Sequence, residues 1–95
     1  MTASFADKVA ERLFLHGTRP PRLPPVLVRP ALRILDMLNA AAQLADLRVP
    51  PGNRLEALRG DLAGFHSIRI NEQWRVVFRW DSGYAHDVRI VDYHS

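Results

Sequence analysis

The last third of the chain alternates apolar and polar residues, and this alternation limits the possible folds more than any other feature. The apolar members of the clearest run are Trp74, Val76, Phe78 and Trp80. This period of two is typical of a strand that buries one face. With its neighbours, the run predicts three antiparallel strands at about 65–70, 74–80 and 84–93. At 95 residues the chain is too short to bury a second core, so we expect one domain spanning 1–95.

Two three-residue turns are predicted to join these strands, at 71–73 and at 81–83. The second ends on glycine, which suits the positive φ that such a turn requires. This register assigns the core face to Ile68, Ile70, Trp74, Val76, Phe78, Trp80, Val88 and Ile90. It assigns the opposite face to Ser67, Arg69, Arg75, Val77, Arg79, Asp87, Arg89, Val91 and Tyr93.

The first half of the chain predicts two helices. One covers 6–16, and a proline-rich connection at 18–25 leads to the second, which begins around Pro25 or Pro30 and ends near Ala42. The second helix is expected to face the core with Ala31, Ile34, Leu35 and Leu38. A short strand is possible at 2–5, and 47–64 reads as irregular loop. The fold class is therefore α+β, with an N-terminal helical hairpin packed on a small antiparallel sheet.

Arginine dominates the basic residues, since only Lys8 of the thirteen is lysine. The guanidinium fork pairs well with phosphate, although a GC-rich genome would also enrich arginine. The predicted register places Arg69 opposite Arg75 and Arg75 opposite Arg89. Like charges opposed in this way cost about 0.2–1 kcal/mol per pair, which favours a bound anion such as an RNA backbone. The alternative is that these side chains extend into solvent or are neutralised by nearby carboxylates such as Asp87 or Glu72.

The positions of the four histidines indicate different roles. His66 and His86 are expected on the core face beside Phe78, too far apart to share a metal, and His16 is expected to cap the first helix. His94 ends the run Asp92-Tyr93-His94, whose side chains suit acid–base chemistry. The alternative is that His94 has no function, because a histidine so near a C-terminus is more often idle. No cysteine, signal sequence or long apolar segment is present, so we expect a cytoplasmic protein with no membrane contact.

Several segments together resemble HigB-type toxins of the RelE superfamily. They are the stretch from Leu47 to Asp61, the runs His66–Asn71 and Trp74–Phe78, and the ending Val91-Asp92-Tyr93-His94. The resemblance covers nearly the whole chain. It implies a RelE-like fold and the toxin half of a type II toxin–antitoxin system, which enters the ribosomal A site and cuts messenger RNA there.

The same resemblance implies a mechanism. In this superfamily the ribose 2′-hydroxyl attacks the adjacent phosphate and the 5′-oxygen leaves, without metal or cofactor. Matched by position, Asp92, Tyr93 and His94 form the C-terminal catalytic motif, while Arg75 and Arg59 stabilise the phosphorane. His94 or Asp92 is expected to move protons and Tyr93 to stack on or orient a base, while Glu56, which stands where some members carry histidine, acts as the base or orients Arg59. The expected catalytic set is therefore His94, Tyr93, Asp92, Arg75, Arg59 and Glu56, and the expected RNA-binding set is Arg69, Arg89, Arg79 and Arg54.

The implied partners are the 30S A site with its messenger and a small helix-turn-helix antitoxin similar to HigA, through which alone the toxin would reach operator DNA. Two other functions remain open. One is a ParE-like poison of DNA gyrase that does not cut RNA. The other is a non-catalytic co-repressor that only binds the antitoxin.

Overall fold

The structure, a computed structural model, describes residues 1–93. Helix α1 (Lys8–His16) begins where the Asp7 side chain accepts a hydrogen bond of 2.9 Å from the Ala10 amide. It ends at Gly17, whose φ of 66° suits a residue without a Cβ atom. A 3₁₀ turn at Pro25–Leu27 leads into α2 (Val28–Ala40). Pro25 therefore opens the helical segment, which was one of the two predicted starts.

The sheet has four antiparallel strands in the order β1-β2-β3-β4. They are β1 (Glu56–Ala57), β2 (Phe65–Arg69), β3 (Trp74–Asp81) and β4 (Tyr84–Asp92). Strand β1 lies in the region predicted to be loop. The predicted strand at 2–5 is reduced to two isolated parallel bridges, Thr2 with Ala85 and Phe5 with Val88.

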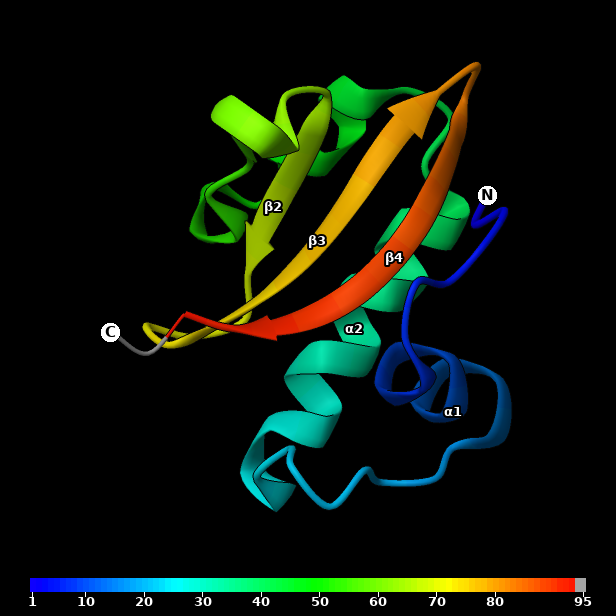
Figure 1. Cartoon of the computed structure of the whole chain (residues 1–95), viewed down its shortest axis with the longest axis vertical. Coiled ribbons are helices and arrows are strands. Elements are labelled where there is room, and N and C mark those ends of the chain that lie inside the picture. Colours follow the sequence, from blue (N-terminus) through cyan, green and yellow to red (C-terminus); the bar gives the residue numbers. More distant parts are fainter. Residues whose placement is uncertain (94–95) are drawn as a thin grey trace.

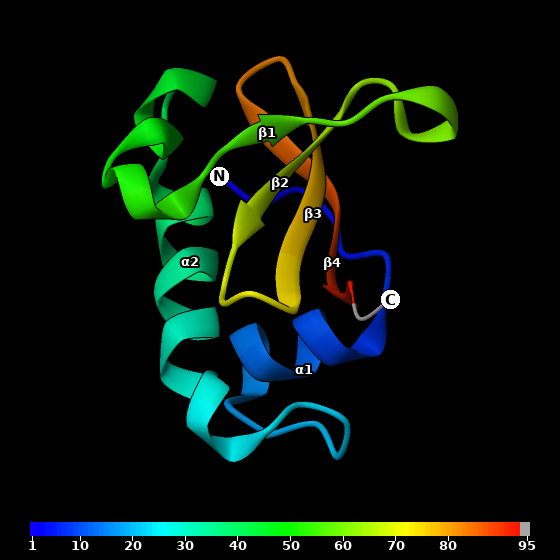
Figure 2. The ribbon, with the colours of Figure 1, turned by 90° about the vertical axis from the view of Figure 1, so that its left-hand side faces the viewer.

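The helices cover one face of this sheet, as the alternation predicted. In Figure 2, α2 runs alongside the strands. Helix α1 lies below the strands, near the end of β4. All four α2 residues predicted to face the core are buried, and so are Ile68, Val76, Phe78 and Val88 from the sheet. Burial of these apolar side chains is the main source of stability that the sequence offers.

The first predicted turn is confirmed and the second is wrong. Arg69 lies opposite Arg75, so 71–73 form the first turn as expected. Asp81, however, pairs with Tyr84, which leaves a two-residue turn of Ser82 and Gly83 with φ of 54° and 84°. Two positive φ values define a type I′ turn, whose twist matches that of the strands.

A β-bulge then changes the register of β4. Arg79 pairs with His86 but Val77 pairs with Arg89, so β4 carries one extra residue at this point, where Asp87 has a φ of 54°. Beyond the bulge Val88 and Ile90 face the core, as predicted. The predicted pairing of Arg75 with Arg89 is wrong, because Arg75 lies opposite Val91.

The irregular segment before β1 is held by one buried side chain. Asn53 is fully buried, and its Nδ2 donates to the carbonyls of Leu47, at 3.2 Å, and Val49, at 3.3 Å. Further 3₁₀ turns at Leu44–Arg48, Pro51–Asn53 and Gly60–Leu62 shape the rest of it. This packing fixes the approach of the chain, drawn in green in Figure 1, to β1, which is labelled in Figure 2.

Candidate active site

Arg75 lies at the centre of a cluster on the sheet face away from the helices. Its Nη1 donates to the Ser67 hydroxyl at 3.0 Å, and its Nη2 lies 3.7 Å from Glu56 Oε1. Its Cζ lies 5.6 Å from the centroid of the Tyr93 ring. Three residues of the expected catalytic set, Arg75, Glu56 and Tyr93, are thus brought together.

These contacts orient the Arg75 guanidinium without removing it from solvent. The side chain is 17% exposed and that of Glu56 is 55% exposed. An ion pair this accessible adds at most about 1 kcal/mol to stability. The larger effect is geometric, because three contacts from β1, β2 and the end of β4 leave the guanidinium few alternative orientations.

Ser67 was placed on this face from the sequence but was given no function. It is fully buried, and Arg75 is the donor to its hydroxyl. Its position opposite Glu56 on β1 could not be expected, because β1 itself was missed. The available signal was a small polar residue two positions before Arg69, on the face predicted to carry the site arginines.

The sheet face away from the helices, which carries Arg69, Arg75, Arg79 and Arg89 and is here called the arginine face, holds more negative charge than the sequence suggested. Arg79 contacts Asp87 at 3.4 Å and Asp81 at 3.9 Å, and Arg69 lies 4.0 Å from Glu72. Within the predicted row, Glu72 beside Arg69 and Glu56 beside Arg75 thus realise the alternative in which carboxylates neutralise the arginines.

Arg89 lies across from Val77, and its Cζ is 5.3 Å from the centroid of the Phe65 ring. Its Nε is buried and has no hydrogen-bond partner among residues 1–93. The expected row of three opposed arginines therefore reduces to the single pair Arg69–Arg75, with Arg89 held separately by an aromatic ring.

The two loop arginines lie outside the cluster. Arg54 ends one 3₁₀ turn with φ of 47°, and Arg59 precedes another. Both are exposed, and within the part of the chain that the structure describes neither side chain makes an ion pair or hydrogen bond. No contact joins either of them to Arg75.

The C-terminal motif divides between the two faces of the sheet. Asp92 lies opposite Trp74, and Gln73 Nε2 donates to its Oδ1 at 2.9 Å. With Val9 and Ile90, Asp92 lines a cleft on the helix side. Tyr93 is on the other face with Arg75, and its amide donates to the Gln73 carbonyl at 2.6 Å. His94 lies outside the described residues.

Of the histidines, His66 is on the core face as expected and His86 is not. The His66 ring stacks on Phe78 at 5.9 Å between centroids, and burial lowers the pKa of His66. The two-residue turn of Ser82 and Gly83 places His86 opposite Arg79, on the same face as Arg75. His16 occupies the last turn of α1, where a cation is favourable.

The described residues were also compared with what a metal site and a membrane-spanning helix require. Among residues 1–93, no three histidine or acidic side chains are grouped so as to hold a metal ion. No helix in the same range is both long and apolar enough to cross a bilayer.

Comparison with solved structures supports the fold. YafQ from E. coli superimposes with a TM-score of 0.62, covering 97% of this chain and 93% of that protein at 9% sequence identity. A second structure of YafQ gives a TM-score of 0.55. This likeness shows that the two helices and the four-stranded sheet are arranged as in YafQ.

Sequence comparison is more specific. The family described as "RelE-like toxin of type II toxin-antitoxin system HigB" matches residues 3–94. Toxin HigB-1 of Vibrio cholerae is 41% identical over 85 residues, 90% of each chain. Endoribonuclease HigB of Proteus vulgaris is 30% identical over 66 residues, 63% of this chain and 72% of that one. The chain therefore belongs to the HigB-like family of RelE-like toxins, which act in type II toxin–antitoxin systems with a cognate antitoxin.

Proposed function

We propose that this toxin is an endoribonuclease that cuts messenger RNA in the A site of the 30S ribosomal subunit. The observation that carries the proposal is the fixed guanidinium of Arg75, which is partly exposed on a sheet face and flanked by a carboxylate and an aromatic ring. A phosphate entering this face would meet a cation that needs no reorganisation. The name of the Proteus relative, an endoribonuclease, supports the same chemistry.

The reaction is a transesterification. The ribose 2′-hydroxyl loses its proton to a base and forms a bond to phosphorus, while the bond from phosphorus to the 5′-oxygen breaks and an acid protonates that oxygen. Negative charge grows on the phosphoryl oxygens between these events. A preoriented Arg75 stabilises that charge, and Tyr93 offers a ring on which a base can stack.

Glu56 and Asp92 are assigned by their position relative to Arg75, and His94, which lies outside the described residues, by its match to the family's C-terminal motif. Glu56 is on the same face, 3.7 Å from the guanidinium, and is solvent-accessible, which supports it as the general base. Asp92 lines the cleft on the other face, so it acts less directly. We assign His94 as the acid that protonates the leaving oxygen. Arg59 joins phosphorane stabilisation only if its loop approaches Arg75, so Arg59→Ala should cost less activity than a change at Arg75.

The remaining arginines of the face, Arg69, Arg79 and Arg89, with Arg54 in the loop, are proposed to contact the RNA backbone. A helix-turn-helix antitoxin is proposed to neutralise the toxin and to bring it to operator DNA. No cofactor is invoked, and the proposed site of action is the cytoplasm.

The test is induction of the toxin without its antitoxin, followed by mapping of new 5′ ends on cellular messengers by primer extension. We expect cuts within translated regions that disappear when translation is blocked. Arg75→Lys keeps the charge but loses the two-pronged geometry, so cleavage should fall by about 100-fold or more. His94→Ala should also abolish the cuts, while Arg48→Lys, at an exposed arginine outside the site, should cut normally.

Other results would replace the proposal. Growth arrest with intact messenger and damaged DNA would indicate a gyrase poison. Absence of both arrest and cuts, with antitoxin binding retained, would indicate a non-catalytic co-repressor. If Arg75→Lys and His94→Ala both cut messenger as the wild type does, the residue assignment is wrong, although the protein is still an endoribonuclease.

A further inference from the structure

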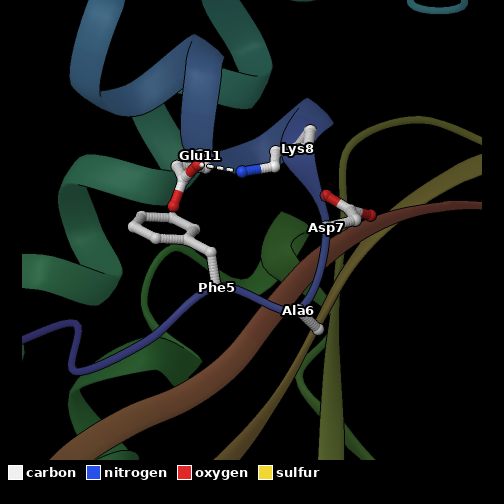
Figure 3. Close-up of a pocket in the computed structure, with 5 residues that line it drawn as sticks. All are labelled: Phe5, Ala6, Asp7, Lys8 and Glu11. Carbon is white, nitrogen blue, oxygen red and sulfur yellow. Dashed lines mark hydrogen bonds and ion pairs between the residues drawn. The ribbon is translucent and has the colours of Figure 1, made fainter.

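The excess positive charge of the chain lies in residues 8–33 and not on the sheet. This segment holds six cations and one carboxylate, Glu11, whereas the remaining residues hold seven cations and nine carboxylates. Its exposed arginines are Arg12, Arg19, Arg22, Arg29 and Arg33. Within residues 1–93 none of them forms an ion pair, and the segment's single pair joins Lys8 to Glu11 at 3.4 Å (Figure 3). The sheet arginines, by contrast, are largely neutralised.

Two of these arginines line a groove between α1 and the proline-rich connection. The groove measures about 100 Å³, and its lining residues are Lys8, Val9, Arg12, Thr18, Arg19, Pro20 and Pro21. The Arg19 guanidinium is held in place, because its Nη1 donates to the carbonyls of Leu23, at 3.2 Å, and Pro20, at 3.4 Å. No carboxylate lines the groove, and although Lys8 is paired with Glu11, Arg12 and Arg19 form no ion pair with a described residue and can bind an anion that enters it.

A larger cleft lies between this groove and Asp92, on the side of the sheet that the helices cover. The cleft measures about 510 Å³, and its lining residues are Asp7, Val9, Arg22, Trp74, Ile90 and Asp92. Val9 lines both hollows, so they adjoin. Asp92 belongs to the C-terminal motif, so the cleft begins where β4 leaves the sheet, beside the start of α1 (Figure 2). The cleft and the groove thus form a path on the helix side of the sheet that begins at Asp92, and an RNA strand from the Arg75 face would reach it around the edge strand β4.

The mixed lining of the cleft suits a nucleotide. Val9, Trp74 and Ile90 offer apolar surface to the face of a base. The carboxylates of Asp7 and Asp92 can accept hydrogen bonds from the amino group on the edge of a base. Arg22 can pair with a phosphate. The size also falls within the range of roughly 300–1,000 Å³ that is usual for ligand sites.

We propose that the cleft and the groove form a second substrate site, which binds the RNA strand as it continues away from the point of cleavage. One base enters the cleft, and the phosphates that follow contact Arg22, Arg12 and Arg19. This inference rests on the proposed function, because it assumes that RNA occupies the sheet face. Its consequence is that a strand long enough to reach both sites binds more tightly than a short one.

The experiment compares two single-stranded oligonucleotides of 2′-O-methyl RNA, about 4 and about 12 nucleotides long, by fluorescence anisotropy. These oligonucleotides cannot be cleaved, because the attacking hydroxyl is blocked. The wild type should bind the long one at least about tenfold more tightly. The double variant Arg12→Ser/Arg22→Ser should bind both lengths with similar affinity. The slope of log affinity against log salt concentration should become shallower by about 1.4, because two phosphate contacts are lost. Near 0.1 M salt this corresponds to a roughly 25-fold lower affinity of the variant for the long oligonucleotide.

The matched control is Arg33→Ser/Arg48→Ser, which removes the same charge at two exposed arginines outside the path. It should retain the preference for the long oligonucleotide. Urea unfolding and circular dichroism of both variants establish that they fold like the wild type. Poly-L-glutamate at equal charge concentration should compete poorly, because it offers no base to the cleft.

The proposal is overturned by any of four results. In two of them the wild type binds both oligonucleotides equally well or does not bind the long one. In the others Arg12→Ser/Arg22→Ser still prefers the long oligonucleotide, or polyglutamate competes as well as RNA of equal charge. Each is distinguishable from failure of the proposed function, which would appear as uncut messenger in the induction experiment whatever the binding results.

Discussion

A guanidinium held by a hydroxyl, a carboxylate and an aromatic ring acts differently from one that is free in solvent. Long basic side chains lose about 2 kcal/mol of rotational entropy when they are fixed. In Arg75 much of this loss occurs on folding, because Ser67, Glu56 and Tyr93 restrict the side chain before any substrate binds. A phosphate that binds there does not have to order the cation. This is the physical basis for assigning transition-state stabilisation to Arg75 and a positioning role to Ser67.

A second residue, His66, couples stability to pH. Burial lowers the pKa of His66 below its usual value of 6.5. Between the lowered pKa and about 6.5 the unfolded chain binds more protons than the folded one, so the free energy of unfolding rises with pH. We expect stability to fall as the pH drops below about 6.5 and to be regained above it. Urea unfolding at a series of pH values between about 5 and 8 measures this slope.

The contribution of His66 is isolated by His66→Phe, which keeps a ring against Phe78 and removes the titration. The variant should lose part of the slope below about pH 6.5. His16→Gln serves as the control, because His16 is exposed at the end of α1. An identical slope in wild type and His66→Phe would contradict the assignment.

At the scale of elements, the turn between β3 and β4 determines which residues share a face. Ser82 and Gly83 both have positive φ, and serine tolerates this less well than asparagine. We expect Ser82→Asn to raise the free energy of unfolding by about 0.5 kcal/mol and Ser82→Val to lower it by about 1 kcal/mol. Urea denaturation checks both values. A stabilising effect of Ser82→Val would contradict the type I′ geometry.

Local pattern predicted the elements that bury apolar residues and missed those that do not. The alternation from Trp74 to Trp80 and the stripe on α2 gave the sheet, the second helix and its core face. Strand β1 spans only Glu56 and Ala57, both exposed, so it has no apolar pattern to detect. Its presence depends on pairing with β2, which is a tertiary interaction.

The bulge escaped prediction for a related reason. An extra residue at Asp87 leaves the apolar positions Val88 and Ile90 facing the core, so the sequence is compatible with either register. The predicted turn was one residue too long and the bulge was missed, and each error shifts the pairing of β3 with β4 by one residue. Together they leave the same residues facing the core but change which residues lie opposite one another on the arginine face. They moved Arg89 away from Arg75 and His86 onto the arginine face. Burial constrains the core side of a strand, whereas nothing comparable constrains the exposed side.

At the scale of the whole molecule, charge is distributed unevenly between the two layers. The helices and their connection carry the positive excess, and the rest of the chain is slightly acidic. Arg29 and Arg33 lie one turn apart on α2, and Arg29 is in its first turn, where the helix dipole disfavours a cation. Uncompensated charges in such positions cost stability, and they create a long-range field that attracts polyanions.

This field predicts an effect of salt on the rate of encounter. We expect Arg29→Ser/Arg33→Ser to lower kcat/KM for cleavage of ribosome-bound messenger by roughly 3–10-fold near 0.05 M salt, with kcat unchanged, because neither arginine lies in the proposed sites. The difference should vanish near 0.3 M, where screening acts within several ångströms. Arg48→Ser, which removes one exposed charge from the acidic remainder of the chain, should change kcat/KM less at every salt concentration. Equal kcat/KM for double variant and wild type at low salt would show that the helical charge does not steer the encounter. A reduced kcat would instead place one of these arginines in contact with the reacting complex, since only contacts that change between bound substrate and transition state alter kcat.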